Sequence, residues 1–168
     1  MIHIVLFEPE IAQNVGNILR SCAAMNAQLH VIHPLGFLLH SKEFNRAMMD
    51  YDKLTELVEH NSLEECLSAI NGEVFYITRY GMKTPNEFDF LASHNDIVIV
   101  FGKESTGIPK PILRENLDHC IRIPMHPQAR SMNVSNTVAI ILYEVQRQLN
   151  FDGLSSVEVL KGKDWLLQ

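Results

Sequence analysis

Five short apolar runs separated by helical patterns constrain the fold of this 168-residue chain most strongly. Each run is apolar on both of its faces, which is typical of parallel strands that are covered by helices on either side. The runs are IHIVLF (2–7), LHVI (29–32), VFYIT (74–78), DIVIVF (96–101) and CIRIP (120–124). Strands that alternate with helices predict an α/β domain with a mostly parallel sheet flanked by helices.

Helical patterns fill the intervals between these runs. Helices are expected over residues 14–25, 42–51, 63–70 and 134–149. Asn14 is the candidate cap of the first helix, and Ser62 with Glu65 forms a capping box before the third. Pro111 is expected to be the first residue of a further short helix. One domain is therefore expected over residues 1–150, with a short tail over 151–168.

The helix expected over 134–149 carries a wide apolar arc. One stripe at helical spacing consists of Val134, Val138, Ile141, Leu142 and Val145. Ala139, Ile140 and Tyr143 widen this stripe beyond the arc of a surface helix. We therefore expect the helix to be buried on two sides, with another subunit on the second side. The alternative is a central helix within a monomer.

Several classes of protein are disfavoured by the composition. The sequence contains no apolar run of about 18 residues, the length of a membrane span, and its first residues lack the features of a signal peptide. Cys22, Cys66 and Cys120 are isolated, which favours a reducing cytoplasm over a disulfide scaffold. No metal site is expected, although His30 and His33 are three residues apart. The net charge of −6 counts against a nucleic-acid binder but leaves room for a local basic patch.

Polar residues gather in three segments of the chain. In NVGNILR (14–20), Asn14, Asn17 and Arg20 follow one another at helical i+3 steps. The loop FGKESTGIP (101–109) directly follows a strand, where ligands bind in open parallel sheets, yet it lacks the glycine fingerprint and the Walker pair of nucleotide-binding loops. The third segment crowds the entrance of the last helix with more polar side chains than one cap needs: Ser131, Asn133, Ser135 and Asn136. Each segment alone is also compatible with an ordinary cap or loop.

Taken together, in this order and spacing, the three segments resemble a known family. N-x-x-N…R near residue 20, F-G-x-E-x-x-G near 101 and I-P-M…S-M-N-x-S-N near 123–136 look like the three motifs of the SPOUT-type RNA ribose 2′-O-methyltransferases. The resemblance is strongest to the small single-domain tRNA (cytidine/uridine-34) 2′-O-methyltransferases, which act at the wobble nucleotide. It is carried by IVLFEPEIAQNVGNILRSCA, LHVIHPLGF, MDYDKL and RSMNVSNTVAIILYEVQRQL.

The resemblance implies a fold, a cofactor and partners. It implies a C-terminal deep trefoil knot, S-adenosylmethionine as the methyl donor without a metal, and a homodimer with the site at the subunit interface. The substrate would be tRNA, through its anticodon loop, in the cytoplasm, and neither DNA nor a membrane would be a partner. The cofactor is expected on Ile77, Gly102, Ile123 and Ser131, with Met125 and Met132 close by. Arg20 matches the catalytic arginine, and Asn133 is expected at the reacting centre. The remaining polar wall would face the substrate through Asn14, Asn17, Glu104, Ser135 and Asn136.

The sequence also departs from the motif of these relatives. Lys103, Ser105 and Thr106 replace the usual P-E-T-R pattern around Glu104, so a phosphate-contacting arginine is missing, and Lys103 is expected to restore the charge. Val15 replaces a threonine. The alternatives are therefore the same methylation at another tRNA or rRNA site, a non-catalytic RNA-binding member of the fold, and a small-molecule enzyme that uses NAD or a nucleotide. The absent glycine fingerprint opposes the last of these.

The chemistry expected of Arg20 follows from its side chain. A guanidinium has a pKa near about 13, so neutralising it at pH 7 would cost roughly 8 kcal/mol. We therefore expect Arg20 to hold an RNA phosphate and to stabilise the developing alkoxide rather than to act as the base. Because the net charge is negative, attraction of RNA must be local, through residues such as Arg20, Arg46, Lys103, Arg114, Arg122 and Arg130.

Overall fold

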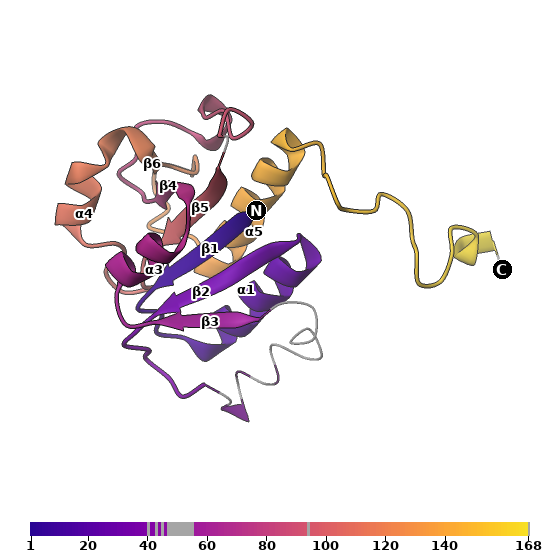
Figure 1. Cartoon of the computed structure of the whole chain (residues 1–168), viewed down its shortest axis with the longest axis horizontal. Coiled ribbons are helices and arrows are strands. Elements are labelled where there is room, and N and C mark those ends of the chain that lie inside the picture. Colours follow the sequence, from indigo (N-terminus) through magenta and orange to yellow (C-terminus); the bar gives the residue numbers. More distant parts are fainter. Residues whose placement is uncertain (40, 43, 45, 47–55, 94, 168) are drawn as a thin grey trace.

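The computed structural model describes residues 1–39, 41–42, 44, 46, 56–93 and 95–167. Within these residues the strands form one six-stranded sheet in the order β3-β2-β1-β5-β4-β6, and every neighbouring pair is parallel (Figure 1). The predicted α/β class with a parallel sheet is confirmed. The strands are β1 (Ile2–Phe7), β2 (Ala27–Ile32), β3 (Leu57–His60), β4 (Gly72–Ile77), β5 (Asp96–Phe101) and β6 (Cys120–Ile121).

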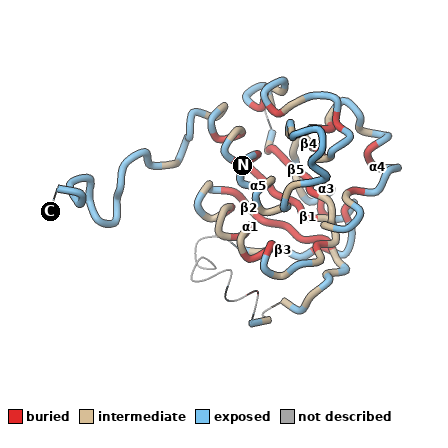
Figure 2. The backbone as a smooth tube through the Cα atoms, turned by 180° about the vertical axis from the view of Figure 1, so that it is seen from behind, coloured by how far each residue is buried: buried red, intermediate tan, exposed pale blue. Residues whose placement is uncertain are grey.

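Helices cover both faces of this sheet and create two apolar cores. α1 (Ala12–Ala24) and α5 (Val134–Gln148) pack with one set of strand residues, which includes Ile4 and Leu6. α3 (Leu63–Ala69) and α4 (Lys110–Glu115) pack with the alternate set, which includes Val5 and Val98. The strands therefore lie between two layers and are buried along most of their length, as Figure 2 shows. This burial explains why the runs are apolar on both faces.

The structure corrects several of the expected boundaries. β3 was missed, because Leu57–His60 is a short edge strand that includes a charged glutamate and so lacks the apolar pattern. The strand expected over 120–124 is paired only at Cys120 and Ile121. α4 begins at Lys110, one residue before Pro111. The helix expected over 42–51 lies largely outside the described residues, and MDYDKL lies entirely outside them.

The expected cap of the first helix is also wrong. α1 begins at Ala12, so Asn14 lies inside the helix, and its N-cap residue, Ile11, makes no side-chain cap hydrogen bond within the described structure. α3 does use its cap, since Ser62 Oγ accepts from the Glu65 N–H at 3.1 Å. The Glu65 carboxylate accepts from the Asn61 N–H at 2.8 Å, one residue before the position that a capping box uses.

α5 separates its apolar residues into a core side and an open side. Val138, Ile141, Leu142 and Val145 are fully buried against the sheet and α1. Ile140 and Tyr143 are instead 43% and 54% exposed. The second apolar side that the sequence predicts therefore exists, and in the single chain it faces solvent.

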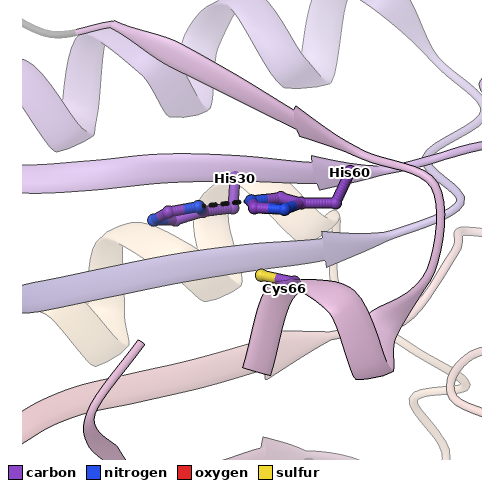
Figure 3. A group of neighbouring side chains, drawn as sticks. All are labelled: His30, His60 and Cys66. Atoms are coloured by element: carbon purple, nitrogen blue, oxygen red, sulfur yellow. Dashed lines mark hydrogen bonds between the residues drawn. The ribbon is translucent and has the colours of Figure 1, made fainter. Parts of the chain in front are cut away.

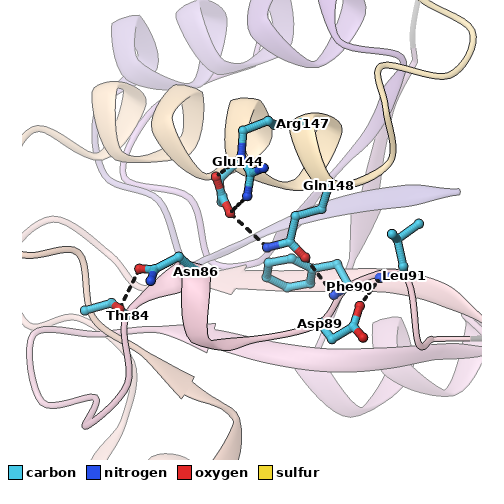
Figure 4. Close-up of polar contacts among 8 residues, drawn as sticks. All are labelled: Thr84, Asn86, Asp89, Phe90, Leu91, Glu144, Arg147 and Gln148. Carbon is cyan, nitrogen blue, oxygen red and sulfur yellow. Dashed lines mark hydrogen bonds and ion pairs between the residues drawn. The ribbon is translucent and has the colours of Figure 1, made fainter.

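The connection from β4 to β5 is fastened to the end of α5. The Gln148 side chain accepts from the Phe90 N–H at 3.0 Å and donates to Glu144 at 2.8 Å (Figure 4). Glu144 also holds Arg147 through two contacts of 2.8 Å. Phe90 itself is buried, with its ring edge-on to Phe75 of β4. α5 is thus anchored at its C-terminal end to the connection between β4 and β5.

The segment after α5 has a different character. Residues 151–167 leave the sheet and its helices as an extended arm (Figure 1), and their side chains are mostly exposed. A boundary at residue 150 stays a prediction. No helix within the described residues is long and apolar enough to cross a membrane.

Three histidines form a diagonal line across neighbouring strands. His30 lies two residues further along β2 than the partner of His3, and His60 lies two residues further along β3 than the partner of His30. Residues two apart share a face of a sheet, so all three rings lie on one side. The ring nitrogens are 2.9 Å apart at both junctions, and His3 contacts Asp96 of β5 at 3.2 Å.

This arrangement predicts an acid-sensitive contribution to stability. Burial, with the neighbouring His3 and His60 rings, lowers the pKa of His30 from 6.5 to about 4. The His30 imidazole therefore binds a proton more tightly in the unfolded chain than in the folded protein. Unfolding becomes more favourable, by up to about 3 kcal/mol, as the pH falls from about 6.5 towards about 4. We expect His30→Gln to flatten the pH dependence of the unfolding free energy measured by urea denaturation in metal-free buffer. The exposed His126, replaced by glutamine, is the control. An unchanged slope in His30→Gln would show that another group carries the acid sensitivity.

Candidate active site

A pocket of about 560 Å³ opens at the carboxyl ends of β4 and β5, the loop after β6 and the N-terminus of α5. Its size is within the range of small-molecule and cofactor sites. The structure brings together here all six residues that were expected to hold the cofactor: Ile77, Gly102, Ile123, Met125, Ser131 and Met132. Three residues of the expected polar groups also line it, namely Asn14, Glu104 and Asn133.

The topology of the sheet explains this convergence. Ile77 ends β4 and is in register with Phe101, which ends β5, so the two strands stop at the same level. Ile123 follows the short β6, which pairs with β4 on its other side. Three loops therefore leave adjacent strands at one edge, where peptide groups no longer used by the ladder are available to a ligand.

The loop after β5 depends on two glycines. Gly107 has a φ of +73°, a conformation that suits glycine, and its N–H donates to the Lys103 carbonyl at 2.9 Å. This tight turn brings residues 107 and 108 back against Gly102. A Cβ at Gly102 would lie 2.2 Å from the Gly107 carbonyl carbon and 2.3 Å from the Ile108 nitrogen. Gly102 therefore permits the loop itself to close and supports the pocket wall.

Two of the residues that replace the usual loop motif, Ser105 and Lys103, have partners within the chain. Glu10 accepts from the Ser105 N–H at 2.8 Å and from its hydroxyl at 2.7 Å, and these bonds hold the pKa of the Glu10 carboxyl below its usual value. Lys103 Nζ lies 2.7 Å from Glu8, which raises the pKa of the lysine. The ammonium that was expected to replace a phosphate-binding arginine is thus held by a carboxylate of the segment after β1.

A line of hydrogen bonds joins the three motifs. Glu104 accepts from the Glu10 N–H and from the Asn14 side chain, both at 2.9 Å. The Asn14 oxygen accepts in turn from the Asn133 amide at 3.0 Å. Because Asn14 is buried and both ends of its amide are engaged, α1, the loop after β5 and the start of α5 are held in a fixed relation.

The polar residues at the entrance of α5 divide into two groups. Asn133 is the N-cap, and its oxygen accepts from the Ser135 N–H at 2.8 Å, the Ser135 hydroxyl at 2.6 Å and the Asn136 N–H at 3.4 Å. Ser135 and Asn136 lie outside the described lining of the pocket. Ser131, which precedes the cap, does line it. The polar residues at this entrance therefore have different roles. Asn133 caps the helix and takes part in the line of hydrogen bonds, and Ser131 lines the pocket.

Arg20 and Asn17 lie apart from the pocket. They line a shallow hollow of about 350 Å³ on α1, together with Ser21 and Ala24. Arg20 follows Asn14 by six positions, a rotation of about 240° around a helix, so the two side chains leave α1 in different directions. Within one chain, the expected catalytic arginine is not brought to the lining of the pocket that the described residues form.

Part of the pocket wall was not expected from the sequence. Thr78, Arg79 and Tyr80 follow β4 directly and line the pocket. The Arg79 guanidinium lies 5.7 Å from the centre of the Tyr80 ring, and Tyr80 is 74% exposed. Their position after the carboxyl end of a parallel strand was the available signal, since the loop after β5 was selected on that ground.

The site combines a cofactor-sized pocket with a rigid polar wall. Comparison with known proteins identifies the family of the chain. Residues 1–143 match the SpoU rRNA Methylase family. The chain belongs to this family. Its parallel sheet and the surrounding helices therefore have the fold of the SpoU methyltransferases.

Several relatives resemble the chain over almost its full length. A Bacillus subtilis (strain 168) protein described as "Putative tRNA (cytidine(34)-2′-O)-methyltransferase" is 45% identical over 154 residues, which cover 91% of this chain and 96% of that one. A Bacillus anthracis crystal structure is 44% identical, with a TM-score of 0.86, and covers 95% of this chain and 100% of that one. A structure solved in work on the 2-OH methylation of C/U34 on tRNA is 38% identical, with a TM-score of 0.79, and covers 89% and 97%.

Proposed function

We propose that this SpoU-family chain is an S-adenosylmethionine-dependent methyltransferase that modifies the ribose 2′-hydroxyl of the wobble nucleotide, position 34, of tRNA. The observation that carries the proposal is the convergence of the three motifs on one pocket in a chain that is 45% identical to a relative of that description. The cytoplasm, where tRNA is modified, is the proposed location, and the three buried free cysteines are compatible with it.

The pocket fits the proposed methyl donor. Its wall contains Ile77 at the end of β4 and Ile123 shortly after β6, where an adenine ring could contact apolar side chains and pair with peptide groups. Gly102 keeps the loop after β5 compact. Bound there, S-adenosylmethionine would supply a methyl group on a positively charged sulfur. Such a donor is already activated, so the task of the protein is to orient the ribose and to exclude competing acceptors.

The polar residues have separate roles in this proposal. Asn133, held by Asn14 and by its own cap bonds, presents a fixed amide at the mouth of α5. Arg20 binds the RNA phosphate and stabilises the negative charge that develops on the 2′-oxygen as its proton passes to water or phosphate. Asn17 and Arg20, which share the hollow on α1, would contact the RNA.

A homodimer is the second part of the proposal, and the position of Arg20 supports it. Arg20 of α1 does not reach the described pocket lining of its own chain. The neighbouring helix α5 exposes the apolar side chains of Ile140 and Tyr143. A dimer through α1 and α5 would bury this apolar side and would bring the hollow of one subunit to the pocket of the other. We propose that each active site combines Arg20 of one subunit with the cofactor pocket of its partner.

A trefoil knot is the third part, supported by the path of the chain around β6. Ile121 pairs with Ile77 of β4 and also forms a bridge with Lys83. Residues 78–82 must therefore cross from one side of β6 to the other. Such a crossing at the pocket would restrain the loops that are proposed to bind the cofactor.

The dimer predicts a specific effect of Ile140. Ile140→Asp would place a charge on the open side of α5 without entering the core, so we expect folded monomers in light scattering at micromolar concentration, with methyl transfer lost. Val138 and Ile141 would not test this point, because both are fully buried in the single chain and a carboxylate there would disrupt the core. Lys110→Asp, which adds a carboxylate at an exposed position of α4 on the other face of the sheet, is the matched control. A wild-type protein that is a stable monomer would refute the proposed interface.

An anticodon stem-loop tests the proposed substrate. We expect the purified protein to transfer a radiolabelled methyl group to such a stem-loop, because its single-stranded nucleotides can be splayed into a pocket. The rate should fall as salt rises, since phosphate contacts release counterions. A matched stem-loop with 2′-deoxyribose at position 34 should accept no methyl group. Equal labelling of both would place the methyl group elsewhere.

A further inference from the structure

A cluster of nitrogen and sulfur atoms lies outside the proposed active site, on the face of the sheet covered by α3. His30 of β2, His60 of β3 and Cys66 of α3 are all buried, and one side-chain nitrogen or sulfur from each lies within 4.8 Å of the others (Figure 3). We propose that these three side chains form a binding site for a transition-metal ion of the zinc class. The ion would join the edge strand β3 to β2 and to α3.

The donor set matches the chemistry of such ions. Two imidazoles and a thiolate are ligands that Zn²⁺ prefers, and a water molecule would complete four-coordination. The hard cations Mg²⁺ and Ca²⁺ prefer oxygen ligands, and none of the three side chains offers an oxygen. The three ligands come from separate elements, and two of them are close in the chain, with His60 at the end of β3 and Cys66 on the helix that follows it.

The neighbours of His30 supply the support that metal-binding histidines usually have. Its Nε2 lies 2.9 Å from His3, and the far nitrogen of His3 contacts Asp96 at 3.2 Å. The Asp96 carboxylate also contacts the Met1 amino group, which lowers the pKa of Asp96 and keeps it an acceptor. His3 therefore donates to Asp96 and accepts from His30, which leaves Nδ1 of His30 as the nitrogen with a free electron pair, directed at His60. A ligand histidine that donates its other N–H towards a carboxylate is the usual outer arrangement of a metal site.

In the absence of an ion, a hydrogen bond between the two ligand rings occupies the position that the ion would take. His30 Nδ1 and His60 Nε2 lie 2.9 Å apart, and since His30 Nδ1 carries the electron pair in this arrangement, the proton between them belongs to His60. On metal binding the His60 proton would move from Nε2 to Nδ1 of the same ring, and the Cys66 thiol would release its proton to solvent. The two ring nitrogens would then separate slightly to take up the ion, with one proton released per ion and no change in oxidation state.

Cobalt provides a direct test on the wild-type, tag-free protein. After removal of bound metal with a chelator, Co²⁺ should bind with a stoichiometry of one per chain. It should produce the visible bands of a tetrahedral ion and a near-ultraviolet thiolate-to-cobalt charge-transfer band. Added Zn²⁺ should abolish both and raise the melting temperature, because it binds only the folded state. A folded wild-type protein without the charge-transfer band would overturn the proposal and leave the cluster as a hydrogen-bonded chain.

Substitutions assign the ligands. Cys66→Ala should remove the charge-transfer band, whereas Cys22→Ala, which changes an equally buried cysteine on α1, should keep it. His3→Asn should leave the bands in place but weaken cobalt binding by about 10–100-fold, the usual effect of losing an outer partner. A band that persists in folded Cys66→Ala, or that is lost in Cys22→Ala, would contradict the assignment. The readouts are spectroscopic, so they do not depend on whether methyl transfer is the function.

Discussion

Arg20→Ala is expected to reduce methyl transfer by at least about 100–1,000-fold while S-adenosylmethionine binding stays nearly unchanged. The separation follows from the structure, because Arg20 lines the hollow on α1 and the proposed cofactor residues line the pocket. Single-turnover assays with tRNA would measure the loss, and calorimetry would measure cofactor affinity. Lys110→Ala is the control, since that lysine is exposed on α4, on the face of the sheet opposite to α1, and lies outside both the pocket and the hollow. Full activity in Arg20→Ala would remove Arg20 from the catalytic role.

Mixed dimers would show which subunit supplies this arginine. One subunit would carry Arg20→Ala and the other a substitution that blocks the cofactor pocket. If each site combines the two subunits, one site receives both defects and the other receives neither, so the mixed dimer should recover activity that neither parent dimer has. If the arginine acted within its own chain, both sites would be defective and no activity would return.

Gly102→Val is expected to weaken S-adenosylmethionine binding by at least about 100-fold, because an error of about 1 Å in a positioned loop can cost that much. The added Cβ would lie 2.2 Å from the backbone of Gly107, and this overlap can be relieved only by moving the loop that forms the pocket wall. Methyl transfer should be lost with binding. Ala69→Val is the control, because it places a valine at an exposed position of α3 outside the pocket lining. Calorimetry that shows unchanged affinity in a folded Gly102→Val protein would exclude this loop from the cofactor site.

Much of the fold could be predicted because its strands are buried on both faces. The apolar runs at 2–7 and 96–101 coincide with β1 and β5, which lie at the centre of the sheet. The edge strand β3 could not be recognised, since one side of an edge strand needs no apolar residues and Glu59 is tolerated there. The paired part of β6 is only two residues long, so hydrophobic pattern alone could not set its end.

The sequence predicted which residues line the site better than it predicted which side chains contact one another. Motif resemblance selected Gly102 and Ser131, and the sheet places both at one pocket. It could not show how Asn14 is used. This residue lies within α1, and its amide is held by Glu104 and Asn133, which are distant in the chain. Nor could it show that Lys103 is paired with Glu8. Such pairings depend on side-chain directions that spacing along one segment does not determine.

Mapping of ribose methylation tests the central proposal most directly. Transfer RNA from cells with and without this gene would be digested and analysed by mass spectrometry, and the purified protein with S-adenosylmethionine would then be added to the RNA from the deletion strain. We expect the 2′-O-methyl group at nucleotide 34 of particular tRNAs to disappear on deletion and to return with wild-type protein but not with Arg20→Ala. Unchanged methylation at position 34, with a loss at another tRNA or rRNA site, would contradict the proposed substrate.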